Sequence, residues 1–178
     1  MNSPFDTSEY RQRVAKTRQA MDRAGIDVLL VTDPGNMNYL TGYDGWSFYV
    51  HQGLLLLPGR EEPVWFGREQ DSNGARLTTW LTEDSIQGYP DDYVQSRVKH
   101  PMEFAADIVK EHGGQVSRIA VEMDTYYFTG RCLESLRKAL PQGEICDGDA
   151  LVRWVRTVKS DREIEIMRMA ARICEQVM

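Results

Sequence analysis

The sequence has few cysteines, and none of its hydrophobic runs is long. Cys132, Cys146 and Cys174 are widely spaced and form no C-x-x-C pair, which argues against a disulfide framework and favours a reduced compartment. We interpret them as small buried hydrophobic residues. Apolar runs such as residues 54–57 are far too short to span a bilayer, and the N-terminal stretch has no pattern of a signal peptide. We therefore expect a cytoplasmic protein with no membrane partner.

Basic residues are also in the minority. The 21 Lys and Arg residues face 27 Asp and Glu residues, which gives a formal net charge of -6. A chain of this charge lacks the broad positive surface that would attract nucleic acid or an anionic membrane. We expect no nucleic-acid partner.

The motifs of common catalytic and metal sites are missing. The three histidines, His51, His100 and His112, are scattered, without the spacing that places two imidazoles on one metal ion. The sequence has no G-x-S-x-G elbow, no G-x-x-x-x-G-K-[ST] phosphate loop and no G-x-G-x-x-G turn. We predict no catalytic residue, no metal ligand and no cofactor in this chain.

Helix and strand patterns alternate along the chain. The spacing of apolar residues and the capping signals predict helices over 7–24, 36–42, 68–77, 101–112, 132–140 and 149–158, with Asp6, Asn36 and Asp149 as caps. Strands are expected over 26–31, 46–57, 63–66, 118–122 and 143–148. Alternation of this kind predicts an α/β fold, and the hairpin within 46–66 makes it a mixed β-sheet flanked by helices.

The last segment begins with a strong helix signal. Ser160 and Glu163 have the spacing of a capping box, and an apolar stripe from Ile164 to Val177 follows without a stop signal. We place a boundary here, with one domain at 1–159 and the start of a second at 160–178. The apolar stripe is expected to pack on the first domain or on a symmetry-related copy of the chain, or else the helix frays.

Residues 38–53, "NYLTGYDGWSFYVHQG", are unusually rich in aromatic side chains. On a strand, Trp46 and Phe48 would face one way, and Tyr49 and His51 the other. One interpretation is an ordinary sheet with one face in the core. The other is an aromatic wall against a small polar or cationic ligand, because aromatic faces attract positive charge and stack on flat rings.

Three stretches together carry a family resemblance. They are "RVAKTRQAMDRAGIDVLLVTDPGNMNYLTGY" at 13–43, "RIAVE" at 118–122 and "LVRWVRTVKSDREIEIMRMAARI" at 151–173. They resemble the N-terminal domain of the creatinase, prolidase and Xaa-Pro aminopeptidase family, whose catalytic domain has the "pita-bread" fold. Within that family, "GYDGWSFYVHQ" is most similar to the ectoine hydrolases, which open a cyclic amidine. Creatinases carry a basic residue near the position of Val50, so the resemblance does not extend their guanidinium-binding mode to this chain.

The resemblance implies a division of labour. The segment from 160 would be the first helix of a truncated catalytic domain, with the catalytic residues, and any metal, beyond Met178. This fragment, predicted inactive alone, would belong to a C–N hydrolase, contribute homodimer contacts, and present a wall to a small polar or cyclic amidine substrate. That wall would consist of Tyr43, Trp46, Phe48, Tyr49 and His51. Two alternatives stay open: the N-terminal domain of an Xaa-Pro dipeptidase or aminopeptidase, and a stand-alone binding or dimerisation module.

Overall fold

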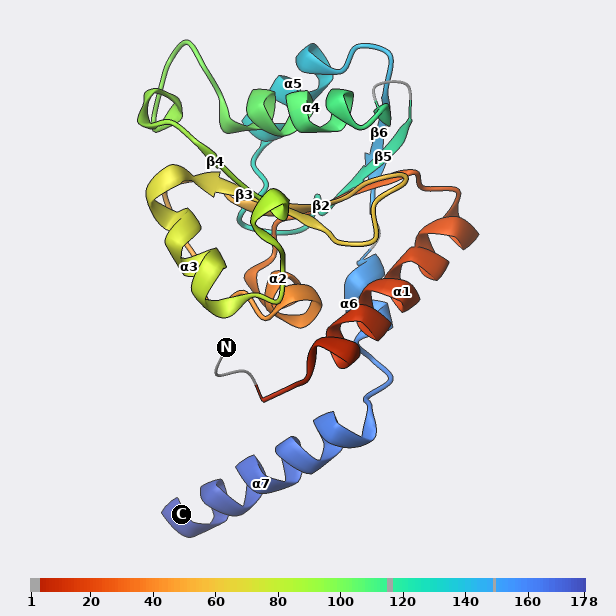
Figure 1. Ribbon diagram of the computed structural model, residues 1–178, viewed down its shortest axis with the longest axis vertical. Helices are drawn as coiled ribbons and strands as arrows, with labels where there is room; N and C mark the ends of the chain where they lie inside the picture. Colours follow the sequence, from red (N-terminus) through yellow and green to blue (C-terminus); the bar gives the residue numbers. More distant parts are fainter. Residues whose placement is uncertain (1–3, 115–116, 149) are drawn as a thin grey trace.

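The computed structural model describes residues 4–114, 117–148 and 150–178, and its centre is a mixed six-stranded sheet (Figure 1). The strand order is β4-β3-β2-β1-β5-β6. β2 pairs antiparallel with β1 and β3, while the pairs β1–β5, β3–β4 and β5–β6 are parallel. The strands are β1 (Val28–Val31), β2 (Gly53–Leu56), β3 (Val64–Arg68), β4 (Ile86–Tyr89), β5 (Arg118–Val121) and β6 (Glu144–Asp147). The predicted mixed α/β sheet and its hairpin are confirmed.

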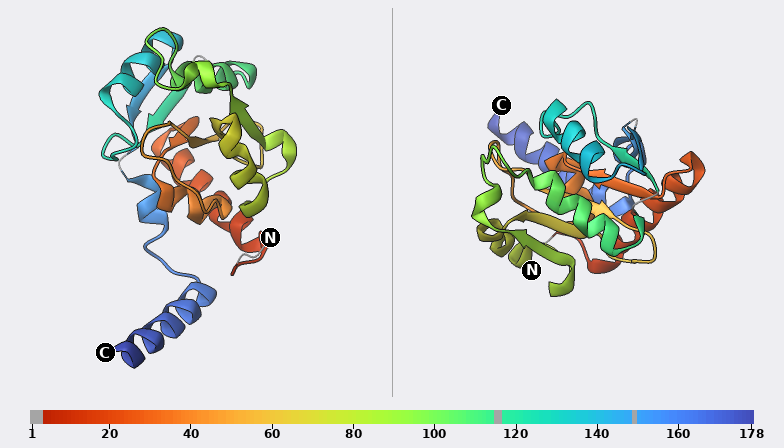
Figure 2. Two further views of the ribbon diagram at one scale, coloured as in Figure 1. Left: turned by 90° about the vertical axis from the view of Figure 1, so that its left-hand side faces the viewer. Right: turned by 90° about the horizontal axis from the view of Figure 1, so that it is seen from above.

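Helices cover both faces of this sheet. They are α1 (Thr7–Ala24), α2 (Pro34–Thr41), α3 (Ser72–Thr78), α4 (Pro101–Glu111), α5 (Gly130–Ala139), α6 (Leu151–Val155) and α7 (Asp161–Val177). α4 and α5 lie on one face, and α1, α2, α3 and α6 on the other (Figures 1 and 2). Leu29 of β1 joins the core on the α1 side and Leu30 the core on the α4 side. Burial on both faces explains why this central strand is apolar throughout.

Several local predictions are confirmed. α1 has the predicted bounds and ends at Gly25, which takes a left-handed conformation with φ of 63°. α4 begins at Pro101, whose fixed φ and missing N–H suit the first helical position. The helix expected over 68–77 is present as α3, after a short 3-10 turn over Glu69–Asp71.

Two predicted caps differ in the structure. Asp6 precedes α1, but its side chain accepts no hydrogen bond from that helix. Asp33, not Asn36, caps α2 and accepts from the Asn36 N–H at 2.9 Å, because the helix already begins at Pro34. The predicted cap Asp149 lies outside the described residues, and α6 begins at Leu151.

The strand predicted over 46–57 is largely wrong. β2 covers Gly53–Leu56 alone, and residues 42–52 form an irregular loop between α2 and β2. The limit lies on the β1 side: Val31, the last residue of β1, pairs with Leu54, whereas β3 continues to Arg68, past Phe66, the partner of Gly53. On the β1 side the residues before Gly53 have no hydrogen-bonding neighbour in a strand, and the alternating sequence there remains a loop.

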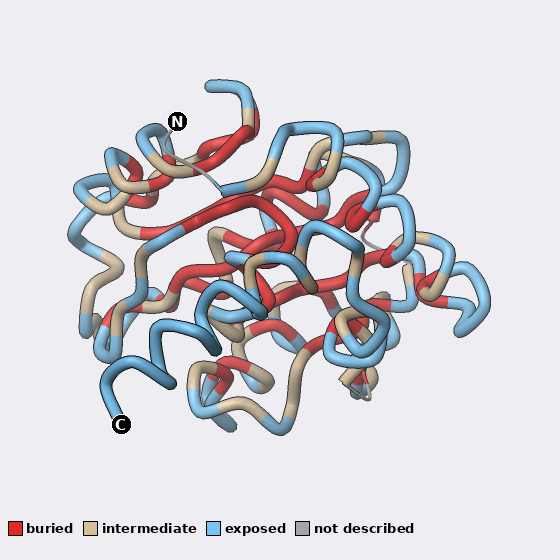
Figure 3. Tube along the Cα trace, turned by 90° about the horizontal axis from the view of Figure 1, so that it is seen from below, coloured by how far each residue is buried: buried red, intermediate tan, exposed pale blue. Residues whose placement is uncertain are grey.

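α7 extends away from the domain, as Figures 1 and 2 show. The predicted capping box is confirmed, since the Ser160 N–H donates to Glu163 at 2.8 Å and the Glu163 N–H donates to Ser160 Oγ at 3.2 Å. None of its residues is buried, and the helix is exposed along nearly all of its length in Figure 3. The exposed apolar side chains include Met167, Met169 and Ile173. Packing of the stripe on the first domain, one of the expected arrangements, is therefore wrong.

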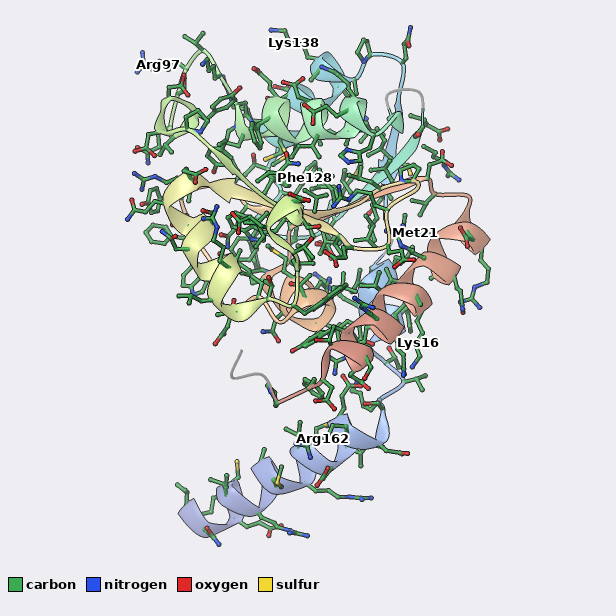
Figure 4. All side chains as sticks on the ribbon, viewed as in Figure 1. Lys16, Met21, Arg97, Phe128, Lys138 and Arg162 are labelled. Atoms are coloured by element: carbon green, nitrogen blue, oxygen red, sulfur yellow. The ribbon has the colours of Figure 1, made fainter. Side chains whose placement is uncertain are left out.

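The first turn of α7 does contact the domain. Glu163 lies against Arg13 of α1, and Arg162, labelled in Figure 4, donates to the Pro4 carbonyl at 3.4 Å. Within the three described ranges, no helix combines the length and apolar character needed to cross a bilayer. The cysteines differ from one another: Cys132 is buried as predicted, Cys146 is partly buried, and Cys174 is exposed on α7, where the prediction of burial is wrong.

Candidate functional site

The buried side chain of Tyr43 supports the loop over residues 42–52 from the side of the core. The Tyr43 side chain is buried, its ring packs 5.5 Å from that of Trp65, and its hydroxyl donates to Gln52 Oε1 at 2.8 Å. Burial, followed by the nearby charge of Asp71, raises the pKa of Tyr43 to about 12. Tyr43 thus joins the two ends of the loop and does not lie on its outer surface.

The outer surface of this loop carries three aromatic rings in sequence. Trp46 is 62% exposed, Phe48 81% and Tyr49 49%. The rings of Trp46 and Phe48 lie 6.1 Å apart, and those of Phe48 and Tyr49 5.3 Å apart in an edge-to-face arrangement. Large aromatic side chains gathered in solvent are typical of an interaction surface. We call Trp46, Phe48 and Tyr49 the aromatic wall.

Two hollows flank the loop. One, of about 200 Å³, lies between residues 47–52 and the segment after β5, where Tyr126 is fully exposed. The other, of about 250 Å³, is lined on its far side by Tyr89, Tyr93, Lys99 and Arg131. Residues 49–51 line both hollows. The loop therefore presents polar and aromatic groups on two sides.

His51 lies at the inner end of the loop, with its ring turned toward the body of the domain. Its ring centroid is 5.0 Å from that of His100, and Cys132 Sγ lies 3.7 Å from Nδ1 and 3.8 Å from Nε2. Burial lowers the pKa of His51, although a hydrogen bond to the Tyr127 backbone opposes the shift. The Tyr89 hydroxyl donates to the His51 carbonyl, which fixes the backbone at this point.

His100 has a structural task of its own. It is the N-cap residue of α4, where Nδ1 accepts a hydrogen bond from the Met102 N–H at 3.2 Å. Burial lowers the pKa of His100 to about 4, and the charge of Arg131 and the charge that His51 carries when protonated add to the shift. The imidazole is therefore neutral at pH 7.

The grouping of His51, His100 and Cys132 was missed in the sequence. Their ligand atoms all lie within 4.8 Å of one another. The residues come from three separate elements, so no short motif could reveal them, and the sequence argument tested only closely spaced histidines. His112, the third histidine, lies elsewhere and contacts Arg60.

A partly buried carboxylate fixes the start of α2 and so the position of the loop that follows it. Glu122, just after β5, accepts hydrogen bonds from the N–H groups of Thr32 and Asp33, each at 2.7 Å, and from Asn36 Nδ2 at 2.5 Å. Arg156 donates to the Asn36 side-chain oxygen at 2.7 Å. Burial raises the pKa of Glu122, while these donors favour its charged form.

The comparisons with known proteins agree with this architecture. The chain is 48% identical over 172 residues to an ectoine hydrolase from Halomonas elongata, an alignment that covers 96% of this chain and 43% of that protein. It is 44% identical over 174 residues to an uncharacterized hydrolase/peptidase of Sinorhizobium fredii, covering 98% of this chain and 44% of the relative. The chain thus spans less than half the length of these curated relatives.

A solved structure and a family description complete the comparison. The Xaa-Pro dipeptidase from Bacillus anthracis superposes with a TM-score of 0.72 at 23% identity, over 92% of this chain and 40% of the dipeptidase, which shows a shared fold. The sequence pattern of the creatinase/prolidase N-terminal domain family matches residues 13–158. The chain therefore belongs to the creatinase/prolidase N-terminal domain family.

Proposed function

We propose that this chain is the recognition domain of a longer hydrolase that opens the C–N bond of a cyclic amidine of the ectoine type. The observation that carries the proposal is the 48% identity to an ectoine hydrolase over nearly the whole chain, in a protein more than twice as long. In this proposal, residues 160–178 begin the catalytic domain, and residues 1–159 hold no group that performs the hydrolysis.

The aromatic wall supplies substrate contacts in this proposal. Trp46 and Phe48 present open ring faces, and an amidinium is both flat and positively charged, so it gains from stacking and from the negative face of an aromatic ring. Tyr49 extends the surface, and His51 closes its inner end. Tyr43 acts as a positioning residue, because its buried ring and its bond to Gln52 hold the loop in place.

Two exposed apolar surfaces, the stripe of α7 and the loop over 42–52, are proposed to contact the catalytic domain and a second subunit, respectively. The stripe of α7 would be covered by the chain's own catalytic domain, since α7 leads directly out of the domain and burying its stripe needs further polypeptide. A second subunit would receive the loop over 42–52, so that the wall faces the neighbour's active site. Three unpaired cysteines fit the reducing cytoplasm as the place where this homodimer would work.

The test is an assay of ectoine hydrolysis by the longer protein of which this chain is proposed to be a part. Trp46→Ala and Phe48→Ala are each expected to raise KM about 5- to 30-fold, which is the range for losing one stacking or cation–π contact of about 1–2 kcal/mol. Leu77→Ala is the matched control, because Leu77 is a similarly exposed apolar residue that lies on α3, outside the loop over 42–52. Its kinetics are expected to match the unaltered protein.

Other outcomes would overturn parts of this proposal. Cleavage of Xaa-Pro dipeptides with no turnover of ectoine would assign the protein to the dipeptidase branch. Turnover of ectoine by the 178-residue chain alone would refute the division between recognition and catalysis. Unchanged KM in both aromatic variants would remove the wall from substrate binding and favour a binding or dimerisation role.

A further inference from the structure

Three side chains with metal-binding atoms meet behind the loop over 42–52. His51 comes from the end of that loop, His100 from the N-cap of α4, and Cys132 from the first turn of α5. One atom of each lies within 4.8 Å of the others. In a tetrahedral zinc site, bonds of about 2.3 Å to sulfur and about 2.0–2.1 Å to nitrogen place sulfur and nitrogen roughly 3.6 Å apart. Cys132 Sγ lies 3.7 Å from Nδ1 and 3.8 Å from Nε2 of the single His51 ring, so one of these two nitrogens, not both, can be the ligand at that separation.

We propose that His51, His100 and Cys132 form a binding site for a zinc-type divalent metal ion. Imidazole and thiolate are the ligands that such ions prefer, and three protein ligands leave a fourth position open. His51 and His100 both line the 250 Å³ hollow, so a water molecule or a small anion can occupy that position. This site shares His51 with the inner end of the proposed substrate surface and lies behind the aromatic wall.

Charge balance favours an anionic fourth ligand. Cys132 is the third residue of α5, where burial raises the pKa of its thiol while the Thr129 hydroxyl, 3.3 Å from Sγ, and the helix N-terminus favour the thiolate that a metal ion would bind. The same helix end, the N-terminus of α4 and the nearby Arg131 are positive and oppose a bare dication. A thiolate and one small anion together neutralise a divalent ion, and Arg131 lines the hollow where that anion would lie.

The hydrogen bonds of the two histidines are compatible with metal binding at a small cost. His51 has a hydrogen bond from one ring nitrogen to the Tyr127 backbone, which leaves the other nitrogen for the ion, as in many metal-binding histidines. His100 must give up its 3.2 Å bond from the Met102 N–H, because a neutral imidazole that binds metal carries its proton on the other nitrogen. The free energy lost with one N-cap hydrogen bond is small compared with the free energy gained when three side chains bind a metal ion.

Without an ion, the three groups satisfy one another poorly. Contacts of 3.7 and 3.8 Å between thiol and imidazole are long, and the two imidazoles lie side by side in a largely buried place. Each group has one hydrogen-bond partner outside the cluster, the Tyr127 backbone for His51, the Met102 N–H for His100 and the Thr129 hydroxyl for Cys132, so only the contacts among the three are weak. A bound metal ion would satisfy all three groups at once.

Cobalt(II) titration of the reduced 178-residue protein tests the proposal. We expect one Co²⁺ per chain, with a thiolate-to-cobalt charge-transfer band and the strong visible bands of tetrahedral coordination, both lost when Zn²⁺ is added. Zn²⁺ is also expected to raise the thermal unfolding temperature, because it binds the folded chain in preference to the unfolded one. Neither readout depends on catalytic activity.

Variants identify the ligands. Cys132→Ser should abolish the charge-transfer band, and His51→Gln should weaken Co²⁺ binding at least about 100-fold, beyond the 10- to 100-fold typical of residues that merely support a ligand. His100→Asn should weaken binding similarly while keeping the α4 cap, since Asn is a preferred N-cap residue. Cys146→Ser and Cys174→Ser are the matched controls and should retain both the band and the affinity.

The opposite results would overturn the proposal. Absence of stoichiometric Co²⁺ and Zn²⁺ binding to the folded protein, verified by circular dichroism, would show a hydrogen-bonded cluster without metal. Persistence of the band in Cys132→Ser, or its loss in Cys174→Ser, would place the metal elsewhere. Unchanged affinity in a folded His100→Asn variant would also refute the ligand set.

Discussion

The guanidinium of Arg13 on α1 lies 3.3 Å from the carboxylate of Glu163 on the first turn of α7. Glu163 also completes the capping box of α7, so one side chain both starts this helix and attaches it to the domain. Arg13 is buried, lies 4.0 Å over the Phe5 ring and 4.5 Å over the Tyr39 ring, and donates to the Tyr39 carbonyl at 3.1 Å. The direction in which α7 leaves the domain is thus fixed at its first turn.

Arg13→Met is expected to lower the free energy of unfolding by about 3–5 kcal/mol, the usual cost of removing one partner of a buried ion pair. Met fills much of the space but leaves Glu9, Glu163 and the Tyr39 carbonyl without their donor. Urea unfolding measures the loss. Arg23→Met, at an exposed position on the same helix, should change stability by less than about 0.5 kcal/mol. Equal effects of the two substitutions would contradict the burial argument.

Glu122→Gln is expected to destabilise the protein by about 2–3 kcal/mol. Glu122 accepts from three N–H groups, and a glutamine amide would turn its own N–H₂ toward one of these donors, which leaves buried donors unsatisfied. Chemical denaturation measures this loss. Glu144→Gln removes only an exposed pair with Arg118 and should cost at most about 1 kcal/mol. A smaller loss for Glu122→Gln than for this control would show that the network does not hold α2.

Two glycine substitutions should have opposite effects. A Cβ at Gly53 would lie 2.8 Å from the Val31 carbonyl oxygen and 2.9 Å from the Phe66 ring, so Gly53→Ala is expected to cost about 1–3 kcal/mol by overpacking. A Cβ at Gly130, the first residue of α5, would meet nothing within 4 Å. Gly130→Ala should therefore be neutral or stabilise by up to about 1 kcal/mol. Thermal unfolding compares them, and a stabilising Gly53→Ala would refute the close approach of β1 and β2.

Stability should fall in alkali because of Tyr43. Burial raises the pKa of Tyr43 to about 12, above the ordinary value near 10, so the folded state holds this proton after the unfolded state has lost it. The stabilisation is complete below about pH 10 and is lost as the pH rises to about 12, by about 2–3 kcal/mol in total.

Tyr43→Phe isolates this contribution. The variant loses the hydrogen bond to Gln52 and starts from a lower stability, but its unfolding free energy should decline less steeply between pH 10 and 12. Urea denaturation at several pH values measures both slopes. Tyr126→Phe, at a fully exposed position, should keep the slope of the unaltered protein. Parallel slopes for Tyr43→Phe and the unaltered protein would contradict the assignment.

Local signals in the sequence predicted much of the fold. The bounds of α1, the capping box of α7 and the start of α4 at Pro101 follow from contacts between residues a few positions apart. The apolar run of β1 correctly indicated a strand covered on both faces. The family resemblance drew on the same stretches, and its expectation of an α/β domain is confirmed.

The loop over 42–52 could not be predicted in this way. Its alternating aromatic residues have a high strand propensity, but β1 ends at Val31, and the chain before Gly53 forms no strand although β3 continues to Arg68. Tyr43 is equally instructive, because the sequence placed it with the exposed aromatic residues and the structure places it in the core. Strand propensity is local, whereas pairing depends on a segment elsewhere in the chain.

The sequence by itself determined where α1, α4 and α7 begin, which strand is central, and to which family the chain belongs. Tertiary structure alone decided that α7 leaves the domain from the Arg13–Glu163 pair and that His51 and Cys132, 81 positions apart, lie within 4 Å. The physical reason is the separation along the sequence over which each interaction acts. Caps and helical periodicity depend on residues a few positions apart, whereas these contacts form only when the folded sheet brings distant segments together.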